Sequence, residues 1–124
     1  MVIGVGTDIL RIGQLQPEYL KTDDPFLVKT YSKAEISDAK KRELPLDYYA
    51  TRFAGKEAVF KAFGMSGDHV LMSEIEILND ENGAPHVNLY GNMKKEAQKR
   101  GVKNIQISLS YERDYAVAFA VFEA

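Results

Sequence analysis

The C-terminal part of the chain alternates between two kinds of side chain, and this pattern restricts it to extended structure. From Val102 to Tyr111, isoleucine and leucine alternate with Asn, Gln and Ser. From Tyr115 to Phe122, alanines at every second position alternate with larger apolar residues. A period of two puts alternate side chains on one face of a strand, so two strands joined by a tight turn are expected. Ala116, Ala118 and Ala120 would share a flat face, to be covered by a neighbouring chain or by this chain's own long helix.

The rest of the chain mixes strands with helices. Strands are expected at 2–9, 74–78 and 86–89, the last two around the turn pair Asn82-Gly83. Capping and stop signals place helices at 25–31, from 33 onward, at 46–63 and at 92–100. The elements follow in the order strand, helices, hairpin, helix, hairpin, and 124 residues favour one domain spanning 1–124.

Charge and composition exclude several classes of function. Lys and Arg number 16 against 18 for Asp and Glu, a net charge of -2, which gives no overall attraction to nucleic acid or anionic membranes. The sequence has no cysteine, which rules out disulfides, zinc-thiolate sites and thiol nucleophiles. Its N-terminus does not resemble a signal peptide, and no apolar run is long enough to cross a membrane. We therefore expect a cytoplasmic protein that binds neither nucleic acid nor membrane.

Two charged residues fall where the 46–63 helix should be apolar. Glu57 and Lys61 lie about 40° apart on the helix, within the arc that also carries several small or aromatic residues. These are Ala50, Phe53, Ala54 and Ala58. A Glu–Lys pair spaced i,i+4 is ordinarily a solvated ion pair, and that remains the alternative. Charge on a packed face instead indicates a partner such as a metal ion or a phosphate.

The first strand supplies a second carboxylate. Asp8 shares a face with Gly4 and Gly6, which is otherwise bare of side chains. Proteins usually hold Mg²⁺ with two carboxylates together with substrate phosphates and water. Asp8 and Glu57 are therefore candidate metal ligands, and Lys61 could neutralise a phosphate in the same space. The alternative is that Asp8 only accepts a hydrogen bond in a turn or cap.

Other motifs point away from common nucleotide and metal sites. The chain has no P-loop, and Gly4-Val5-Gly6 lacks the third glycine of a dinucleotide fingerprint. His69 and His86 have no partners at metal-ligand spacing, so both are expected at the surface or in the hairpin. Gly55, inside the long helix, indicates that another element approaches closely there.

Four motifs together resemble a known family. They are Gly6-Thr7-Asp8-Ile9, Arg52-Phe53-Ala54-Gly55-Lys56-Glu57-Ala58 with Lys61 and Gly64, Asn82-Gly83-Ala84-Pro85, and Ser108-Leu109-Ser110. In this order and at these separations they resemble the phosphopantetheinyl transferases of the holo-acyl-carrier-protein synthase type. The resemblance implies an α+β fold of two related strand-helix-hairpin halves, and a homotrimer with active sites between its subunits.

The reaction implied by the resemblance belongs to fatty acid biosynthesis. It moves the phosphopantetheine arm of coenzyme A to a serine of apo acyl carrier protein and releases adenosine 3′,5′-bisphosphate. By matching position, Asp8 and Glu57 would bind Mg²⁺, with Mn²⁺ as a substitute, and Lys61 would stabilise the leaving phosphate. The residues that would bind coenzyme A or shape its cleft are Arg52, Lys56, Gly64, Gly83, Pro85, Ser108, Ser110 and Tyr111. Glu57, Asp8 or a metal-bound water are the alternatives for accepting the serine proton.

Two positions depart from the family pattern. The family usually continues Ser-x-Ser with His, where this chain has Tyr111, a hydrogen-bond donor without a switchable positive charge. After the first strand the family often has an acidic residue and then an arginine three positions on, where this chain has Arg11 and Gln14. We therefore expect lower nucleotide affinity and a changed contact with the carrier protein.

Two competing interpretations remain at the level of sequence. An RNase H-like metal-dependent enzyme also begins with a strand carboxylate, but it would continue with further strands instead of the helices announced by Asp24-Pro25 and Ser32-x-x-Glu35. A non-catalytic oligomeric binding protein would carry Glu57 and Lys61 as a purely structural pair.

Overall fold

The computed structural model describes residues 1–15, 20–21, 24–65 and 71–124, and its strands form two antiparallel sheets. Strands β1 (Val2–Arg11), β5 (Tyr115–Glu123) and β4 (Asn104–Glu112) form one sheet in the order β1-β5-β4. Strands β2 (Ile75–Asn79) and β3 (Pro85–Leu89) form the other. The helices are α1 (Pro25–Thr30), α2 (Lys33–Ala39), α3 (Pro45–Ala62) and α4 (Gly91–Lys99), with short 3₁₀ turns η1 (Ile12–Gln14) and η3 (Met72–Glu74). None of the described helices is long and apolar enough to cross a bilayer.

The local signals in the sequence mark the ends of these elements. The side chain of Asp24 accepts the Phe26 N–H at 2.8 Å and caps α1. Ser32 and Glu35 form the predicted capping box of α2. Gly64 follows α3 with φ +70°, and Gly83 turns the β2–β3 hairpin with φ +85°. These short-range predictions are confirmed.

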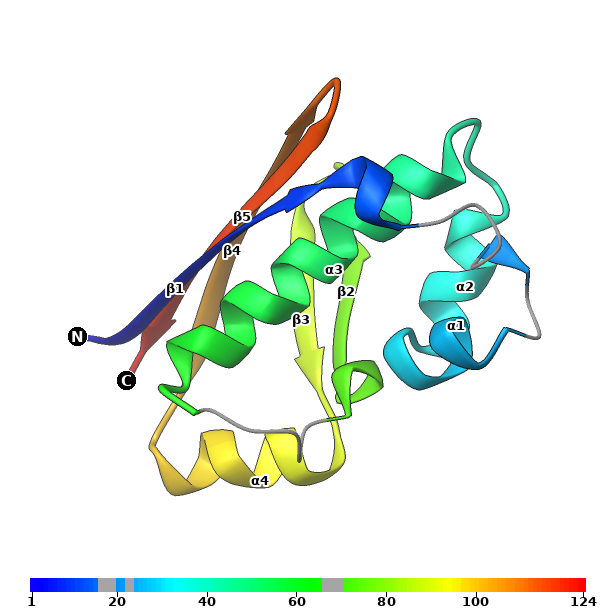
Figure 1. Ribbon diagram of the computed structural model, residues 1–124. Helices are drawn as coiled ribbons and strands as arrows, with labels where there is room; N and C mark the ends of the chain where they lie inside the picture. Colours follow the sequence, from blue (N-terminus) through cyan, green and yellow to red (C-terminus); the bar gives the residue numbers. More distant parts are fainter. Residues whose placement is uncertain (16–19, 22–23, 66–70) are drawn as a thin grey trace.

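Helix α3 lies across one face of the β1-β5-β4 sheet, and the two pack closely (Figure 1). A side chain at Gly6 would overlap the backbone oxygen of Ala58 and lie 2.7 Å from the Ala62 nitrogen. A side chain at Gly55 would lie 2.5 Å from Ile77 Cδ1 of β2 and 3.0 Å from Leu109 Cδ2 of β4. Both glycines therefore allow α3 to sit between the two sheets, as predicted for Gly55.

The alanine face of β5 is covered by the chain's own long helix. Ala116, Ala118 and Ala120 are fully buried in the core with α3, so the first of the two expectations, a neighbouring chain on these alanines, is wrong. The opposite face is the open one, because its side chains are large and exposed. This outer apolar face consists of Ile3, Val5 and Ile9 of β1 and Tyr115, Val117 and Phe119 of β5.

The α+β class is confirmed, but the expected two strand-helix-hairpin halves are not complete. Each hairpin follows a helix, as expected. Among the described residues, however, α4 comes directly after β3 and has no leading strand of its own. Strand β1 pairs with β5 instead of with the first hairpin, so the two halves share one sheet.

A buried ion pair ties α3 to its surroundings. Lys56 and Glu35, both with fully buried side chains, lie 2.7 Å apart. Lys56 also donates to the backbone oxygens of Met72, at 3.1 Å, and Ile75. The other oxygen of Glu35 accepts the Ile77 N–H at 2.9 Å. The pair thereby joins α2, α3, η3 and β2 in one network.

Candidate active site

Asp8, Glu57 and Lys61 meet where β1 crosses α3. The Lys61 ammonium donates to Asp8 Oδ1 at 3.0 Å and to the Thr7 carbonyl at 3.2 Å. Only 15% of the Asp8 side chain is exposed, against 52% of the Lys61 side chain. Glu57 is half-buried, one turn before Lys61 on α3. The two helix charges thus lie at the rim of the packed face, and Lys61 pairs with Asp8 instead of with Glu57.

The electrostatics of this cluster favour a bound cation. Burial and the nearby Asp8 charge raise the pKa of Glu57, and the Lys61 ammonium partly opposes this rise. No residue that the structure describes donates a hydrogen bond to the Glu57 carboxylate. In those residues, no three His, Cys, Asp or Glu side chains gather as a metal cage. Two adjacent carboxylates with free oxygens fit Mg²⁺, which keeps water and takes phosphate oxygens as its other ligands.

Four of the predicted nucleotide-binding residues line one cavity. Arg52, Gly83, Pro85 and Tyr111 surround a space of about 150 Å³ between α3, the β2–β3 turn and the end of β4. The Arg52 guanidinium donates to Asn79 Oδ1 at 2.7 Å, which fixes it beside β2. The sequence therefore predicted residues that the fold brings together from three separate elements.

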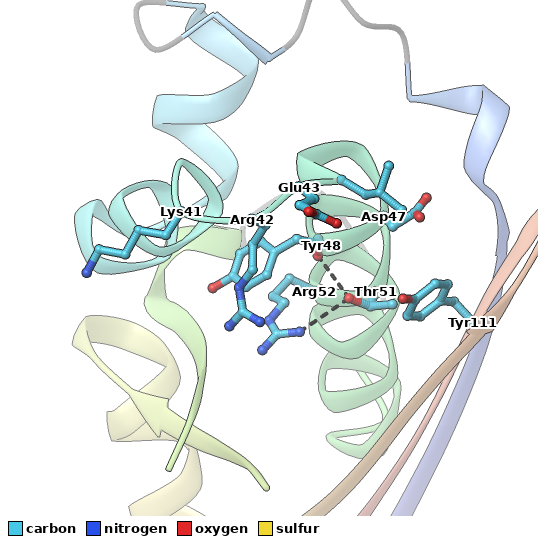
Figure 2. A pocket seen from close by; sticks show the side chains of 9 residues that line it. Lys41, Arg42, Glu43, Asp47, Tyr48, Thr51, Arg52 and Tyr111 are labelled. Carbon is cyan, nitrogen blue, oxygen red and sulfur yellow. Dashed lines mark hydrogen bonds between the residues drawn. The ribbon is translucent and has the colours of Figure 1, made fainter. Parts of the chain in front are cut away.

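A second cavity adjoins the first and shares Thr51, Arg52 and Tyr111 with it (Figure 2). Its volume is about 360 Å³, and it is rich in charge. The remaining lining residues are Lys41, Arg42, Glu43, Leu44, Asp47 and Tyr48. Arg52 and Lys61 are nine residues apart on α3, roughly 14 Å along the helix axis. The two cavities are thus separated along α3 from the carboxylate cluster. A long substrate could reach from one to the other.

Comparison with known proteins gives the family. A family model described as 4′-phosphopantetheinyl transferase superfamily matches residues 4–120. The chain belongs to this superfamily. The holo-[acyl-carrier-protein] synthase of Syntrophus aciditrophicus is 40% identical over 124 residues, which is 99% of this chain and 97% of that protein.

Solved structures agree with the sequence comparison. The crystal structure of the Neisseria meningitidis holo-[acyl-carrier-protein] synthase has a TM-score of 0.88 at 29% identity and covers 100% of both chains. The Bacillus anthracis holo-(acyl-carrier-protein) synthase in complex with CoA (3′,5′-ADP) has a TM-score of 0.79 at 28% identity, covering 100% of this chain and 98% of that one. The predicted resemblance is confirmed, and the RNase H-like and non-catalytic interpretations are set aside.

Three predicted residues of this phosphopantetheinyl transferase lie away from the cavity lined by Arg52 and Tyr111. Lys56 is buried, and its three donor hydrogens have partners in Glu35, Met72 and Ile75, so it has none left for coenzyme A. Of its two predicted roles, a direct contact with coenzyme A is therefore not available to Lys56 in this structure, and shaping the cleft stays a prediction. Ser108 and Ser110 are exposed on the outer face of the sheet, since they pair across strands with Phe119 and Val117.

The other predicted positions of the transferase that the structure describes, Gly64 and His86, lie after α3 and in the β2–β3 hairpin. Gly64 ends α3 and lines a third cavity, of about 520 Å³, together with Lys61. His86 is exposed in the hairpin and bonds to Asp80 at 2.9 Å, as expected for a hairpin histidine. His69 lies outside the described residues.

Sequence reasoning missed two contributors to the transferase's cavities. Tyr48 lies beneath the guanidinium groups of Arg42 and Arg52, and neither Tyr48 nor Arg42 was predicted to bind coenzyme A. The i,i+4 spacing of Tyr48 and Arg52 on one helix was a usable signal. The position of Arg42 was not, because it depends on how the loop after α2 folds back over α3.

Proposed function

We propose that this phosphopantetheinyl transferase works in the cytoplasm and moves the phosphopantetheine arm of coenzyme A to a serine of apo acyl carrier protein. The other product is adenosine 3′,5′-bisphosphate. The observation that links this function to particular residues is the convergence of Asp8, Glu57 and Lys61, the last of which lines the 520 Å³ cavity. Phosphoryl transfer depends mainly on positioning and charge neutralisation, which such a cluster supplies.

Asp8 and Glu57 are the residues that would hold Mg²⁺ or Mn²⁺. A metal ion bound there would neutralise the negative charge of the coenzyme A pyrophosphate. The structural support is the pair of neighbouring carboxylates and the raised pKa of Glu57, because a cation between them would relieve their repulsion.

Lys61 is the residue that would stabilise the leaving group. As the carrier serine oxygen bonds to the phosphorus of the arm, the bond from that phosphorus to the nucleotide phosphate oxygen breaks. Negative charge then collects on the departing phosphate. The Lys61 ammonium is half-exposed and 3.0 Å from Asp8, so it can turn to this charge without breaking a buried contact.

Arg52 and Tyr111 would hold the nucleotide end of coenzyme A, with Gly83 and Pro85 shaping the opposite wall. Arg52 brings a fixed positive charge. Tyr111 brings a hydroxyl that cannot carry positive charge where the family usually has His. Phosphate binding there should therefore lack the pH dependence that a histidine would give near neutral pH.

The outer apolar face of the sheet supports a homotrimer, in which neighbouring copies would cover it. Contiguous exposed apolar side chains on a soluble protein commonly mark an interaction surface. Ser108 and Ser110 lie on this same face, so covering it would also bring these two residues against another subunit.

We expect Phe119→Glu to break this assembly, because Phe119 is 48% exposed at the centre of the outer face. Light scattering should report three chains for the wild type and one for the variant. The rate of arm transfer should fall at least roughly tenfold, because active sites that lie between subunits would be lost. Val28→Glu, on α1 with 61% exposure, is the matched control and should stay trimeric. A fully active wild-type monomer would contradict the proposed assembly. Ala118→Leu would not test this interface, because Ala118 is buried beneath α3 on the other face of the sheet.

Carrier recognition should depend on salt although the chain is net acidic. Acyl carrier proteins are acidic, and exposed basic residues lie in the helical half of the chain that would face them. They are Arg11, Lys21, Lys29, Lys40, Lys41 and Arg42, of which the last two also line the 360 Å³ cavity. Raising the salt concentration should raise KM for the carrier more than KM for coenzyme A. Arg11→Glu should raise carrier KM several-fold and Lys103→Glu should not, while equal effects of the two variants would argue against this docking surface.

Metal-dependent thermal stabilisation tests the proposed site without measuring turnover. Coenzyme A should raise Tm in the presence of Mg²⁺ and much less after chelation. In Asp8→Asn the Mg²⁺-dependent part of the rise should disappear. A rise that is the same with and without Mg²⁺ would count against Asp8 and Glu57 as metal ligands.

A further inference from the structure

Tyr48 contacts two arginines through one aromatic ring. The guanidinium carbon of Arg52 lies 4.1 Å from the ring centroid and that of Arg42 lies 5.1 Å from it. Both distances are within the range of cation–π attraction. Figure 2 shows the two guanidinium groups side by side at the ring, at the edge of the 360 Å³ cavity.

Polar contacts hold the ring and the arginines in this arrangement. The Tyr48 hydroxyl donates to Asp38 Oδ2 at 3.3 Å, and the same oxygen lies 3.7 Å from the Arg42 guanidinium. Burial raises the pKa of Tyr48 well above its usual value, so the hydroxyl keeps its proton. On the other side, Arg52 donates to Asn79 and to Thr51 Oγ1. Tyr48 is therefore fixed at both its ring and its hydroxyl.

Within the described residues these arginines form one ion pair, between Arg42 and Asp38, so the Arg52 guanidinium has no carboxylate bonded to it. Arg52 is only 6% exposed, and its Nε is buried without a hydrogen-bond partner among the described residues. Burial is the main cause that lowers the pKa of Arg52, and the positive charge of Arg42 adds to it. Glu43 and Asp47 also line the cavity, but neither forms an ion pair with these arginines within the described part of the chain. Two adjacent guanidinium groups with free donors match the oxygens of a phosphate group.

We propose that Tyr48 is a positioning residue, whose ring holds Arg42 and Arg52 together so that both bind one phosphate group of coenzyme A. The inference rests on the proposed function and extends it to two residues, Tyr48 and Arg42. Tyr48 acts through the arginines, so the aromatic ring matters and the hydroxyl matters less. Arg42 is a surface residue of the α2–α3 loop. Its contact with the Tyr48 ring holds its guanidinium group at the cavity.

The test compares Tyr48→Leu, which removes the ring, with Tyr48→Phe, which keeps it. Calorimetry with coenzyme A should give a Kd about tenfold higher for Tyr48→Leu and within about threefold of wild type for Tyr48→Phe. In the transfer assay, KM for coenzyme A should rise in parallel while kcat changes little. A merely structural role would lower Tm and kcat in Tyr48→Leu without this selective change in affinity.

Arg42→Ala provides a second, independent arm, because this exposed side chain can be removed without disturbing the core. It should also raise Kd about tenfold, and Tyr48→Leu/Arg42→Ala should be little worse than either single variant. Dephospho-coenzyme A identifies the phosphate. If the variants weaken only coenzyme A, the arginines bind the phosphate on the ribose; if they weaken both equally, the arginines bind the pyrophosphate.

Three outcomes would overturn the inference. Folded Tyr48→Leu could bind coenzyme A like the wild type, Arg42→Ala could do so, or the losses of the two variants could simply multiply. Should Tyr48→Leu fail to fold, wild-type affinity in Arg42→Ala would still refute the shared phosphate site. A wild-type protein that binds no coenzyme A would refute the proposed function itself, and this inference with it.

Discussion

Asp8→Asn and Glu57→Gln should each lower the rate of arm transfer at least about a hundredfold while leaving the chain folded. Each substitution removes one of the two charged oxygen ligands proposed for the metal ion. Asp8→Asn also removes the charge that pairs with Lys61, but the Lys61 end of that pair is half-exposed and the pair contributes at most about 1 kcal/mol to stability. Glu57→Gln removes one of two repelling carboxylates, so its Tm without metal should not fall.

Steady-state rates with limiting and saturating Mg²⁺ would check this prediction. Glu123→Gln is the matched control, because Glu123 is a carboxylate of the same sheet whose side-chain partners among the described residues are Asn104 and Gln106. The control should keep wild-type activity, and chelation of the wild type should reproduce the loss. Near-normal activity of either site variant in limiting Mg²⁺ would remove that residue from the proposed metal site.

Lys56→Met should destabilise the protein by about 3–5 kcal/mol, because it leaves the Glu35 carboxylate buried without its counter-charge. Burial lowers the pKa of Lys56 and Glu35 favours its charged form, so the two residues depend on each other. For a chain of this length, Tm should fall by roughly 10 °C or more. Thermal and urea unfolding at a fixed protein concentration would measure the change.

Two variants separate this effect from a general loss of charge. Lys61→Met removes a lysine of the same helix that is half-exposed, and it should cost at most about 1 kcal/mol. Lys56→Met/Glu35→Gln should recover part of the lost stability, because no unpaired charge remains and an amide oxygen can still accept one N–H. A Lys56→Met protein as stable as the wild type would show that the buried pair is not needed for the fold.

Features with a local cause were predictable from the sequence. Asp24, Ser32 and Gly64 act within a few residues of their own position, and the structure has them as helix caps. The alternation in β4 and β5 is equally local, and it gave the strands and the grouping of their side chains correctly.

Features that depend on contacts between residues far apart in the sequence were harder to predict. Alternation separates the two faces of β5 but does not say which one α3 covers, since alanine suits contact with a helix of the same chain or of another. Lys56 finds its counter-charge 21 residues away in Glu35 and its other acceptors in backbone oxygens, which carry no sequence signal. The helical pattern therefore singles out Glu57 and Lys61, whose charges lie at the rim, and does not show that the charge of Lys56 is buried in the core.

The most direct test of the account is the mass of a carrier protein before and after reaction. Apo acyl carrier protein would be incubated with this protein, coenzyme A and Mg²⁺, and then weighed by mass spectrometry. We expect the carrier to gain one phosphopantetheine arm on its serine, with equimolar adenosine 3′,5′-bisphosphate released, and neither product to form after chelation or with Asp8→Asn. A carrier that keeps its mass at saturating coenzyme A and Mg²⁺, while a known holo-[acyl-carrier-protein] synthase modifies the same sample, would contradict the account.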